Sequence, residues 1–496
     1  MNNKEIKYIS TRGSSRAKTS AQAIIKGIAE DKGLYVPDYI PKLDMDPSEF
    51  AGMDYRGIAF KVLSEFLTDY TGEELKNCIN NAYDSKFEAA GIVPLVKAGD
   101  AWFLELYHGR TAAFKDMALS ILPYLLTTAL KKEKEEKKIA ILTATSGDTG
   151  KAALEGFADV PGTEIIVFFP RDGVSRIQAM QMVTQEGSNT HVFGIDGNFD
   201  DAQTGVKNIF NDKDLAEELA EKGYRLSSAN SINIGRLVPQ VAYYIWSYIK
   251  LIETGAIKSG DKINIVVPTG NFGNILAAYY AREMGVPVGK FICASNENKV
   301  LTDFINTGIY DSNRDFYVTS SPSMDILISS NLERLLYHLS GGDGGEISAL
   351  MNNLDKQKKY QVGDKIRSGL SDFYGGFADE TETMTAIGKM YGENGYLMDT
   401  HTAVGYKVYE DYRRATGDET PAVIASTASA YKFAESVVKA LGLPDVTDGF
   451  DGIRTLHRAT GVRIPSCLEG LEHKKILHET TLKRDGLAEA VKASLI

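Results

Sequence analysis

The sequence predicts an α/β protein built on parallel sheets, because short apolar runs alternate with amphipathic stretches over most of its length. Parallel strands need crossover helices, so a repeated strand-then-helix pattern favours sheets that are covered on both faces. The chain has 496 residues, of which 43% are hydrophobic and 24% charged. This composition is that of an ordinary globular protein, and the length suggests roughly three domains.

The N-terminal region is predicted to be rich in helix. Apolar residues recur at spacings of three and four residues in the segments 20–30, 60–70 and 72–83. We therefore expect residues 1–90 to form an α-rich cap domain. The first residues carry no apolar signal-peptide core, and no stretch approaches about 18 consecutive apolar residues, so neither a signal peptide nor a membrane span is expected.

Strand–helix pairs follow beyond about residue 92. Their apolar runs stand at 138–145, 163–170, 263–270 and 422–427, each followed by an amphipathic stretch. The charged run at 131–138 is expected to close one helix before the first of these strands. We expect residues 91–496 to form two α/β lobes, a smaller one at 131–240 and a larger one made of 91–130 and 241–496.

Charge and cysteine content exclude several classes of function. The net charge of −11 attracts the chain neither to nucleic acid nor to anionic lipid, so no such partner is expected. Cys78, Cys293 and Cys467 are far apart, and the sequence has no CxxC pair. Neither a disulfide framework nor a zinc site is indicated, so no metal is expected and a reducing, cytoplasmic location is favoured.

Candidate site residues stand where predicted strands end. Ligands of parallel sheets bind beyond the carboxyl ends of strands, and here those ends carry Ser146, Gly270 and Thr427. The turn at 270–274, GNFGN, joins an apolar strand to a helix, so it is either a phosphate cradle at a helix N-terminus or an ordinary tight connection. The turn at 146–151, SGDTGK, lacks the spacing of a Walker A loop, which disfavours an NTPase.

Lys115 is the candidate nucleophile, because Phe114 and Met117 lie among its apolar neighbours in the sequence. Loss of solvation favours the neutral amine, which alone can form a Schiff base with a carbonyl cofactor. Taken alone, a lysine beside an aspartate at the start of a helix is usually a surface residue, and the surrounding segments are what favour a role in the site. An amine, a phosphate cradle and the hydroxyl of Thr427, which suits a pyridine nitrogen, together predict a pyridoxal phosphate site. Thr427 alone also suits a helix N-cap.

Several segments, in order along nearly the whole chain, resemble the threonine synthase family, whose members are pyridoxal phosphate enzymes of the tryptophan synthase β-type fold (fold type II). The segments SANSIN and SSNLERL are the most specific, because related fold type II enzymes such as cysteine synthase and threonine dehydratase differ there. The segments are YISTRG at 8–13, DKGLYVP at 31–37, HGRTAAFKD at 108–116, TATSGDTG at 143–150, SANSINIGRL at 228–237, PTGNFGN at 268–274, MDILISSNLERLL at 324–336, HTAVG at 401–405 and STAS at 426–429.

The resemblance implies a fold type II enzyme with two parallel-sheet α/β lobes and a helical N-terminal cap. It implies that Lys115 holds the cofactor as a Schiff base and that Thr427 faces the pyridine nitrogen. The cofactor phosphate is then expected on the backbone of Gly270, Asn271, Phe272, Gly273 and Asn274. The implied reaction is that of a lyase of threonine biosynthesis, which converts O-phospho-L-homoserine and water to L-threonine and orthophosphate.

Such a substrate needs anchors for a carboxylate and for a phosphate. Ser146 and Thr149 are expected to bind the carboxylate, because they crowd the N-terminus of a helix. Arg236, helped by Asn230, is expected to bind the phosphate, since a guanidinium matches phosphate oxygens in bidentate geometry.

Further polar residues near these segments have open roles. Asn331 and Arg334 are additional candidates for the phosphate, and a structural role for Arg334 is equally open. Asp148 is expected near the cofactor rather than on the substrate. His401 is expected to be a buried histidine that orients its loop.

Two places beside the site depart from the family pattern. The family often has proline where Arg110 stands, and His-Pro where Ser429 and Ala430 stand, which leaves substrate preference open. One alternative is therefore a pyridoxal phosphate-dependent phospho-lyase or dehydratase that yields a 2-keto acid. A non-catalytic binding homologue is the other, although the retained Lys115 and Thr427 argue against it. Monomer and homodimer both remain open, as does an effector site.

Overall fold

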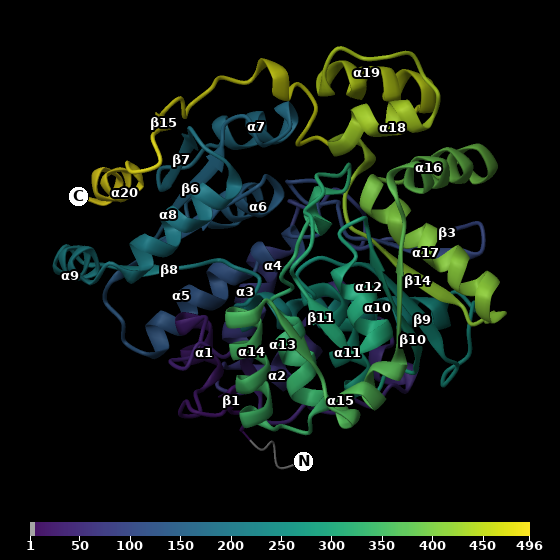
Figure 1. The fold of residues 1–496 in the computed structure, drawn as a ribbon, viewed down its shortest axis with the longest axis horizontal. Helices are drawn as coiled ribbons and strands as arrows, with labels where there is room; N and C mark the ends of the chain where they lie inside the picture. The colour runs from purple at the N-terminus through teal and green to yellow at the C-terminus, as the bar shows by residue number, and fades with distance from the viewer. Residues whose placement is uncertain (1–4) are drawn as a thin grey trace.

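The computed structural model describes residues 5–496, which fold around two large sheets connected by helices (Figure 1). The predicted α/β class with two parallel-sheet units is confirmed. Residues 1–4, the start of the predicted 1–90 domain, lie outside the described residues. The apolar runs form strands because β-branched side chains fill both faces of a buried, pleated sheet.

The larger sheet has, within residues 5–496, the strand order β13-β10-β9-β14-β4-β3. Neighbouring strands are parallel except for β3, which pairs antiparallel with β4 at one edge. The strands are β3 Leu95–Ala98, β4 Ala101–Glu105, β9 Ile263–Pro268, β10 Val288–Ser295, β13 Phe373–Phe377 and β14 Ala422–Ser426.

Helices cover both faces of this sheet. Ile265 of β9 belongs to the apolar core shared with α10 and α11, whereas its neighbour Val266 belongs to the core shared with α17, because successive strand residues point to opposite faces. The helix α10 is buried along nearly its whole length, which explains its apolar composition. The helices of these layers are α10 Ile234–Glu253, α11 Gly273–Met284, α12 Val300–Thr307 and α17 Thr400–Thr416. Further out, α16 Glu380–Asn394 packs on α17, α18 Ala434–Ala440 packs on α16, and α19 Gly449–Thr460 packs on α18.

The smaller sheet is parallel throughout, with the order β15-β7-β6-β5-β8 among the described residues. Its strands are β5 Lys138–Ala144, β6 Thr163–Pro170, β7 Thr190–Ile195, β8 Tyr224–Ser227 and β15 Thr481–Leu482. The helices that pack with it are α6 Asp148–Phe157, α7 Arg176–Val183, α8 Phe199–Asn211, α9 Lys213–Glu221 and α20 Leu487–Leu495.

The end of the chain differs from its sequence-based assignment to the larger lobe. In Figure 1 the C-terminal segment returns to the smaller sheet, where β15 pairs with β7 and α20 packs beside α8. Gly205 of α8 makes room for this contact, since a Cβ there would lie 2.5 Å from the Leu487 side chain. The sequence pattern missed this return because a two-residue strand leaves no apolar run to detect.

The N-terminal helices pack onto the core of the larger unit. The helix α2 lies on α10, and α1 and α3 lie on α5, which ends at the predicted charged run. The helix α2 begins at Tyr55, because the Asp54 side chain accepts the Gly57 N–H at 2.9 Å and caps it there. The elements are β1 Tyr8–Ser10, α1 Ser20–Lys26, β2 Tyr35–Pro37, η1 Pro47–Phe50, α2 Tyr55–Phe66, α3 Gly72–Ala82 and α5 Leu122–Lys132.

Short elements complete the fold and carry several loops of the site. Across residues 5–496, no helix combines the length and the apolarity that crossing a bilayer requires. The remaining elements are α4 Asp116–Leu119, β11 Ile309–Asp311, η2 Pro322–Met324, α13 Leu332–Leu339, α14 Gly344–Gln357, β12 Lys359–Gln361, α15 Asp364–Gly369, η3 Leu370–Asp372, η4 Ala430–Phe433 and η5 Leu471–His473.

Candidate active site

Lys115 stands immediately before α4, in a loop that pairs with the segment following β14. The N–H of Phe114 donates to the carbonyl of Thr427 at 2.7 Å, and Ala113 forms an isolated β-bridge with Ala428. Thr427 itself is buried, and its N–H donates to Thr402 Oγ1 at 3.3 Å. The backbone pairing therefore holds two of the predicted cofactor residues at the same edge of the larger sheet.

The amine of Lys115 lies in a largely dry environment, with 11% of the side chain exposed. Its Nζ donates to Ser323 Oγ at 3.0 Å and lies 3.4 Å from Asp148 Oδ2. Burial lowers the pKa of Lys115, Asp148 opposes this effect, and the charges of Lys432 and Arg236 lower the pKa further. The site therefore favours the neutral amine that a Schiff base requires.

Asp148 is the carboxylate of this cluster. Its Oδ1 lies 2.7 Å from Lys432 Nζ and accepts a hydrogen bond from Gln178 Nε2 at 3.0 Å. Burial alone would raise the pKa of Asp148, but the charges of Lys432 and Lys115 hold it well below its usual value. Lys432 also donates to the carbonyl of Thr111 at 2.9 Å, so the cluster joins the loop before Lys115 to α6.

The turn at 270–274 has the geometry of an anion cradle. Phe272 adopts a left-handed conformation with φ of 64°, and no side chain among residues 5–496 caps the N-terminus of α11 that follows it. A left-handed phenylalanine costs backbone energy of about 1–3 kcal/mol, and such strain is common at functional sites. Gly270 approaches Ser323 so closely that a Cβ would lie 2.4 Å from the Ser323 carbonyl oxygen.

The side chain of Asn274 adds a donor to this turn. Its Oδ1 accepts hydrogen bonds from Tyr243, at 2.9 Å, and from Tyr244, whereas its buried Nδ2 has no partner among residues 5–496. A buried amide donor without a partner is costly unless a ligand meets it. Asn271 and Gly273 complete the turn, and the Asn271 carbonyl is held by Asn331 Nδ2 at 2.9 Å.

Ser146 and Thr149 lie at the N-terminus of α6, and Ser146 is exposed. The hydroxyl of Thr145 accepts the N–H groups of Gly147, at 3.0 Å, and Gly150, at 2.9 Å, which shapes the turn. Gly147 has a φ of 136°. The N–H groups of Asp148 and Thr149, the first two residues of α6, are not used by Thr145 and remain available to an anion.

Arg236 lies in the first turn of α10, with 5% of the residue exposed. Its NH1 donates to the Ala229 carbonyl at 2.9 Å, whereas its Nε has no hydrogen-bond partner, and no ion pair to it is found within the described chain. Burial lowers the pKa of Arg236 to about 10. A buried cation without a carboxylate favours an anionic ligand. Asn230 is exposed in the loop that precedes this helix.

Arg334 has a structural role instead. It is fully buried, and its Nε and NH2 donate to the carbonyls of Tyr35, at 2.9 Å, and Ile232, at 2.6 Å, while NH1 donates to Asn331 Oδ1. These bonds tie an N-terminal strand to the SANSIN segment. These contacts favour a structural role for Arg334 over a role in binding the substrate phosphate.

The family departures lie close to Lys115 without displacing it. Arg110 NH1 pairs with Glu155 Oε1 of α6 at 3.1 Å and is half exposed. The N–H of Ser429 donates to the Ala112 carbonyl at 3.0 Å, and its hydroxyl accepts the Tyr431 N–H at 3.3 Å. The substituted residues thus make local contacts that support the lysine loop.

Several residues of the cluster were not assigned from the sequence. Ser323 contacts Lys115, and Lys432 forms an ion pair with Asp148. Gln178 of α7 donates a hydrogen bond to the same carboxylate. Ser323 lies in an aperiodic loop 208 positions from Lys115, so no spacing could connect them. His401 does orient a loop, as expected, because its Nε2 accepts the Ser323 N–H at 3.1 Å.

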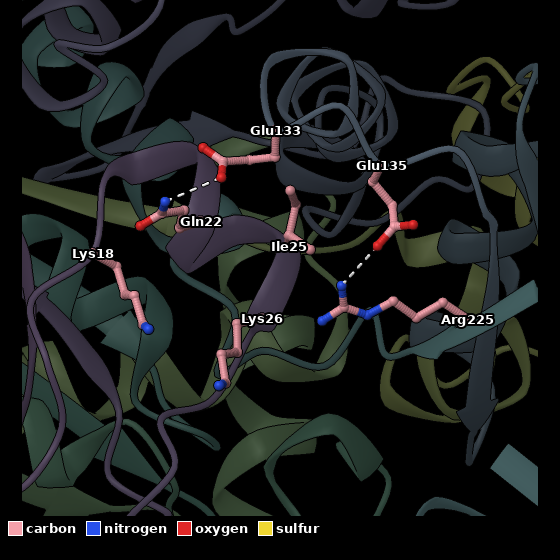
Figure 2. Close-up of a pocket in the computed structure, with 7 residues that line it drawn as sticks. All are labelled: Lys18, Gln22, Ile25, Lys26, Glu133, Glu135 and Arg225. Carbon is pink, nitrogen blue, oxygen red and sulfur yellow. Dashed lines mark hydrogen bonds and ion pairs between the residues drawn. The ribbon is translucent and has the colours of Figure 1, made fainter. Parts of the chain in front are cut away.

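A separate surface cleft of about 320 Å³ lies among α1, the end of α5 and β8 (Figure 2). Its polar groups have protein partners: Gln22 donates to Glu133 at 3.0 Å and Arg225 to Glu135 at 3.2 Å, while Lys18 and Lys26 pair with Glu30 beside the cleft. None of the predicted site residues lines it. The candidate site is therefore the cluster around Lys115 and not this cleft.

The fold and the cluster define a pyridoxal phosphate-dependent enzyme, and residues 88–428 match the family described as "Pyridoxal-phosphate dependent enzyme". Residues 7–83 match "Threonine synthase N terminus" and residues 402–475 match "Threonine synthase, C-terminal". The chain belongs to the threonine synthase family.

Individual relatives agree with this membership. "Threonine synthase-like 1" of Homo sapiens is 40% identical over 445 residues, which are 87% of this chain but 59% of the relative, so the chain spans about three-fifths of that protein. Threonine synthase of Pseudomonas aeruginosa is 37% identical, over a stretch that covers 88% of this chain and 90% of that relative. The crystal structure of pyridoxal phosphate-bound threonine synthase from Brucella melitensis superposes with a TM-score of 0.88, at 34% identity and 99% coverage of both chains.

The residues present fit the cofactor of this family. A desolvated amine, an uncapped helix N-terminus and the unpartnered Nδ2 of Asn274 supply the kinds of group that an aldehyde and a phosphate need. The excess of buried cations over carboxylates near Lys115 also suits a phosphorylated ligand.

Proposed function

We propose that this protein is a threonine synthase, which eliminates phosphate from the γ-carbon of O-phospho-L-homoserine and adds water at the β-carbon to give L-threonine and orthophosphate. The buried guanidinium of Arg236 carries this proposal, because it lacks an acidic partner and its charge acts on Lys115. The family membership of the chain supports the same reaction.

Lys115 would bind the aldehyde of pyridoxal phosphate, and Thr427 would donate or accept a hydrogen bond at the ring nitrogen. A neutral hydroxyl there leaves the ring less fully protonated than a carboxylate would. The backbone N–H groups of residues 270–274 and the Asn274 Nδ2 would hold the cofactor phosphate. When bound, pyridoxal phosphate supplies an electron sink for the carbanions of the reaction.

The substrate is anionic at both ends, and the site offers cations and N–H groups to match. Arg236 would hold the γ-phosphate and stabilise it as it leaves, since a guanidinium offers parallel donors to phosphate oxygens. Ser146, Thr149 and the first N–H groups of α6 would hold the carboxylate. Asn230 would join Arg236 at the phosphate through its exposed amide.

Lys115 would move the protons. Its amine, once detached from the cofactor, would take the proton from the substrate α-carbon and transfer protons at the β-carbon as phosphate leaves and water adds. Burial lowers the pKa of this amine and so shifts it toward the neutral form, which a general base requires. Asp148 would stabilise the ammonium formed in these steps, because it lies 3.4 Å from Nζ.

Product analysis tests the proposal. Purified protein loaded with pyridoxal phosphate is incubated with O-phospho-L-homoserine, and phosphate and threonine are measured together, with Lys115→Ala alongside. Equal amounts of both products, lost in the variant, are expected. Phosphate with a 2-keto acid in place of threonine would instead identify a phospho-lyase, an outcome worth testing because the human relative is named only "threonine synthase-like". If neither product forms, the remaining interpretation is a non-catalytic binding protein.

A further inference from the structure

The serine whose hydroxyl contacts Lys115 is held, through its backbone N–H, by a buried histidine–aspartate pair. Ser323 Oγ lies 3.0 Å from Lys115 Nζ, and the Ser323 N–H donates to His401 Nε2 at 3.1 Å. Since Nε2 accepts, the ring proton lies on Nδ1, which donates to Asp399 Oδ1 at 2.8 Å. The two side chains are only 3% and 0% exposed, so the pair is a fixed part of the interior.

A second cluster fixes the same loop from its other side. The carboxylate of Asp325 accepts hydrogen bonds from Asn296 Nδ2 at 2.7 Å, from Asn298 Nδ2 at 3.0 Å and from Thr319 Oγ1 at 2.8 Å. Ser323 lies two residues before this carboxylate, in η2. The position of its hydroxyl is therefore set by contacts on both sides and not by contact with the lysine alone.

Ser323 and Asp148 offer different chemistry to the amine of Lys115. A carboxylate only accepts, so Asp148 serves the ammonium form. A hydroxyl both donates and accepts, so Ser323 can bond the ammonium and can also donate to the lone pair of the neutral amine. Of the side chains within hydrogen-bond reach of Nζ in residues 5–496, Ser323 is the one that suits both protonation states.

We propose that Ser323 and His401 are positioning residues that hold the amine of Lys115 whenever it is not bound to the cofactor. Ser323 contacts the amine, and His401 fixes Ser323 through its backbone N–H. The holding of the free amine is independent of the substrate, whereas its use in proton transfer rests on the proposed threonine synthase reaction. The charged groups that face the amine are Asp148, Lys432 and Arg236, and a substitution at Ser323 removes none of them.

The first test uses the cofactor-free protein and pyridoxal phosphate alone. The rate of Schiff-base formation is followed by absorbance across pH for the wild type, Ser323→Ala and Ser323→Thr. In the structure Nζ donates to this hydroxyl, so its loss removes an acceptor from the ammonium, and the pH midpoint of Ser323→Ala should fall by about 0.5–1 unit, the equivalent of one hydrogen bond. Ser323→Thr retains a hydroxyl and should stay near the wild-type midpoint.

Matched variants separate positioning from general damage to the loop. Ser320→Ala removes a hydroxyl from the same loop, one that bonds Glu380 and not Lys115, and should leave the midpoint unchanged. His401→Leu removes the acceptor of the Ser323 N–H and should shift the midpoint in the direction of Ser323→Ala. Melting temperatures of all variants show whether each one is folded before its midpoint is compared.

The second test uses the holoenzyme and O-phospho-L-homoserine. Ser323→Ala should lower kcat roughly tenfold while KM changes less than about twofold, because the amine and not substrate binding is affected. A Ser323→Ala protein with the wild-type midpoint and the wild-type kcat would overturn the proposal, as would an equal shift in Ser320→Ala. If the wild type makes no threonine, the proposed threonine synthase activity is wrong. The titration with pyridoxal phosphate alone still tests whether Ser323 positions the amine of Lys115, so the two proposals can fail independently.

Discussion

Lys432 and Asp148 form an ion pair of 2.7 Å in the protein interior, with side-chain exposures of 0% and 5%. The pair joins the segment after β14 to the first turn of α6, and therefore connects the two large sheets across the site. Lys115 places a second amine 3.4 Å from the same carboxylate. The charges of Lys432 and Arg236 exceed that of Asp148, which leaves a positive site that suits a phosphorylated cofactor and an anionic substrate.

Replacing Lys432 with methionine should destabilise the protein by about 3 kcal/mol, because a buried carboxylate loses its closest cation. The pKa of Lys115 should rise in this variant, since a like charge is removed and Asp148 then serves Lys115 alone. Urea denaturation of the cofactor-free protein measures the first effect, and the pH dependence of Schiff-base formation the second. Lys439→Met, on the exposed side of α18, is the matched control and should change stability by less than about 0.5 kcal/mol. Equal stability of both variants would contradict the prediction.

Asp116 should make the protein less stable as the pH rises from about 4 to about 6. Its buried carboxylate accepts the Thr111 N–H at 2.8 Å and hydroxyl at 2.6 Å, but burial dominates and raises its pKa to about 6. The folded state therefore binds a proton that the unfolded state, with a pKa of about 3.9, has already lost. The contribution of Asp116 to the free energy of unfolding is therefore complete below about pH 4 and is lost as the pH rises through about 6.

The Asp116→Asn variant isolates this effect, because an amide of the same shape does not titrate. Between pH 4 and pH 7 the free energy of unfolding of the wild type should fall by about 3 kcal/mol relative to the variant, as expected for a shift of two pKa units in a buried group. Urea denaturation at several pH values measures both curves. Parallel curves would show that the carboxylate has an ordinary pKa.

The sequence predicted the parts of the fold that have a period. The apolar run at 163–170 coincides with β6, and the turn residues Gly270 and Thr427 lie at strand ends, as parallel topology requires. Contacts that depend on the path of an aperiodic loop could not be predicted, and Ser323 beside Lys115 is the clearest case. The N-terminal helix α1 ends at Lys26 because Gly27 leaves the helical conformation, with φ of 72°.

Arg236→Met should separate substrate binding from stability. Loss of the guanidinium should lower kcat/KM by about 100-fold or more, since charge-assisted hydrogen bonds to a phosphate are worth about 1.5–3 kcal/mol each. The cofactor absorbance should not change. The free energy of unfolding without anions should rise by about 1 kcal/mol, because an uncompensated buried charge is removed.

Arg334→Met is the contrasting variant for Arg236. It removes hydrogen bonds to the carbonyls of Tyr35 and Ile232 and to Asn331, so its free energy of unfolding should fall by about 3 kcal/mol. Chemical denaturation and steady-state kinetics on both variants make the comparison. If Arg236→Met lost stability as Arg334→Met does, the guanidinium would be structural and the phosphate site would lie elsewhere.

Gly270→Ala should weaken cofactor binding, because its Cβ would lie 2.4 Å from the carbonyl oxygen of Ser323. The Ser323 backbone cannot yield easily, since His401 holds its N–H and Asp325 anchors the loop. The phosphate turn must shift instead, and the dissociation constant for pyridoxal phosphate should rise at least tenfold, as about 1.4 kcal/mol of lost contact would cause.

Fluorescence titration of the cofactor-free variant measures this constant, and the pH midpoint of Schiff-base formation shows whether Ser323 has moved with the turn. Gly392→Ala in α16 is the control, because nothing lies within 4 Å of its added Cβ, and alanine there should stabilise the helix by up to about 1 kcal/mol. Wild-type cofactor affinity in Gly270→Ala would mean that the Ser323 loop gives way at low cost. The hydroxyl of Ser323 could not then fix the amine of Lys115, so this one variant tests the phosphate turn and the positioning role together.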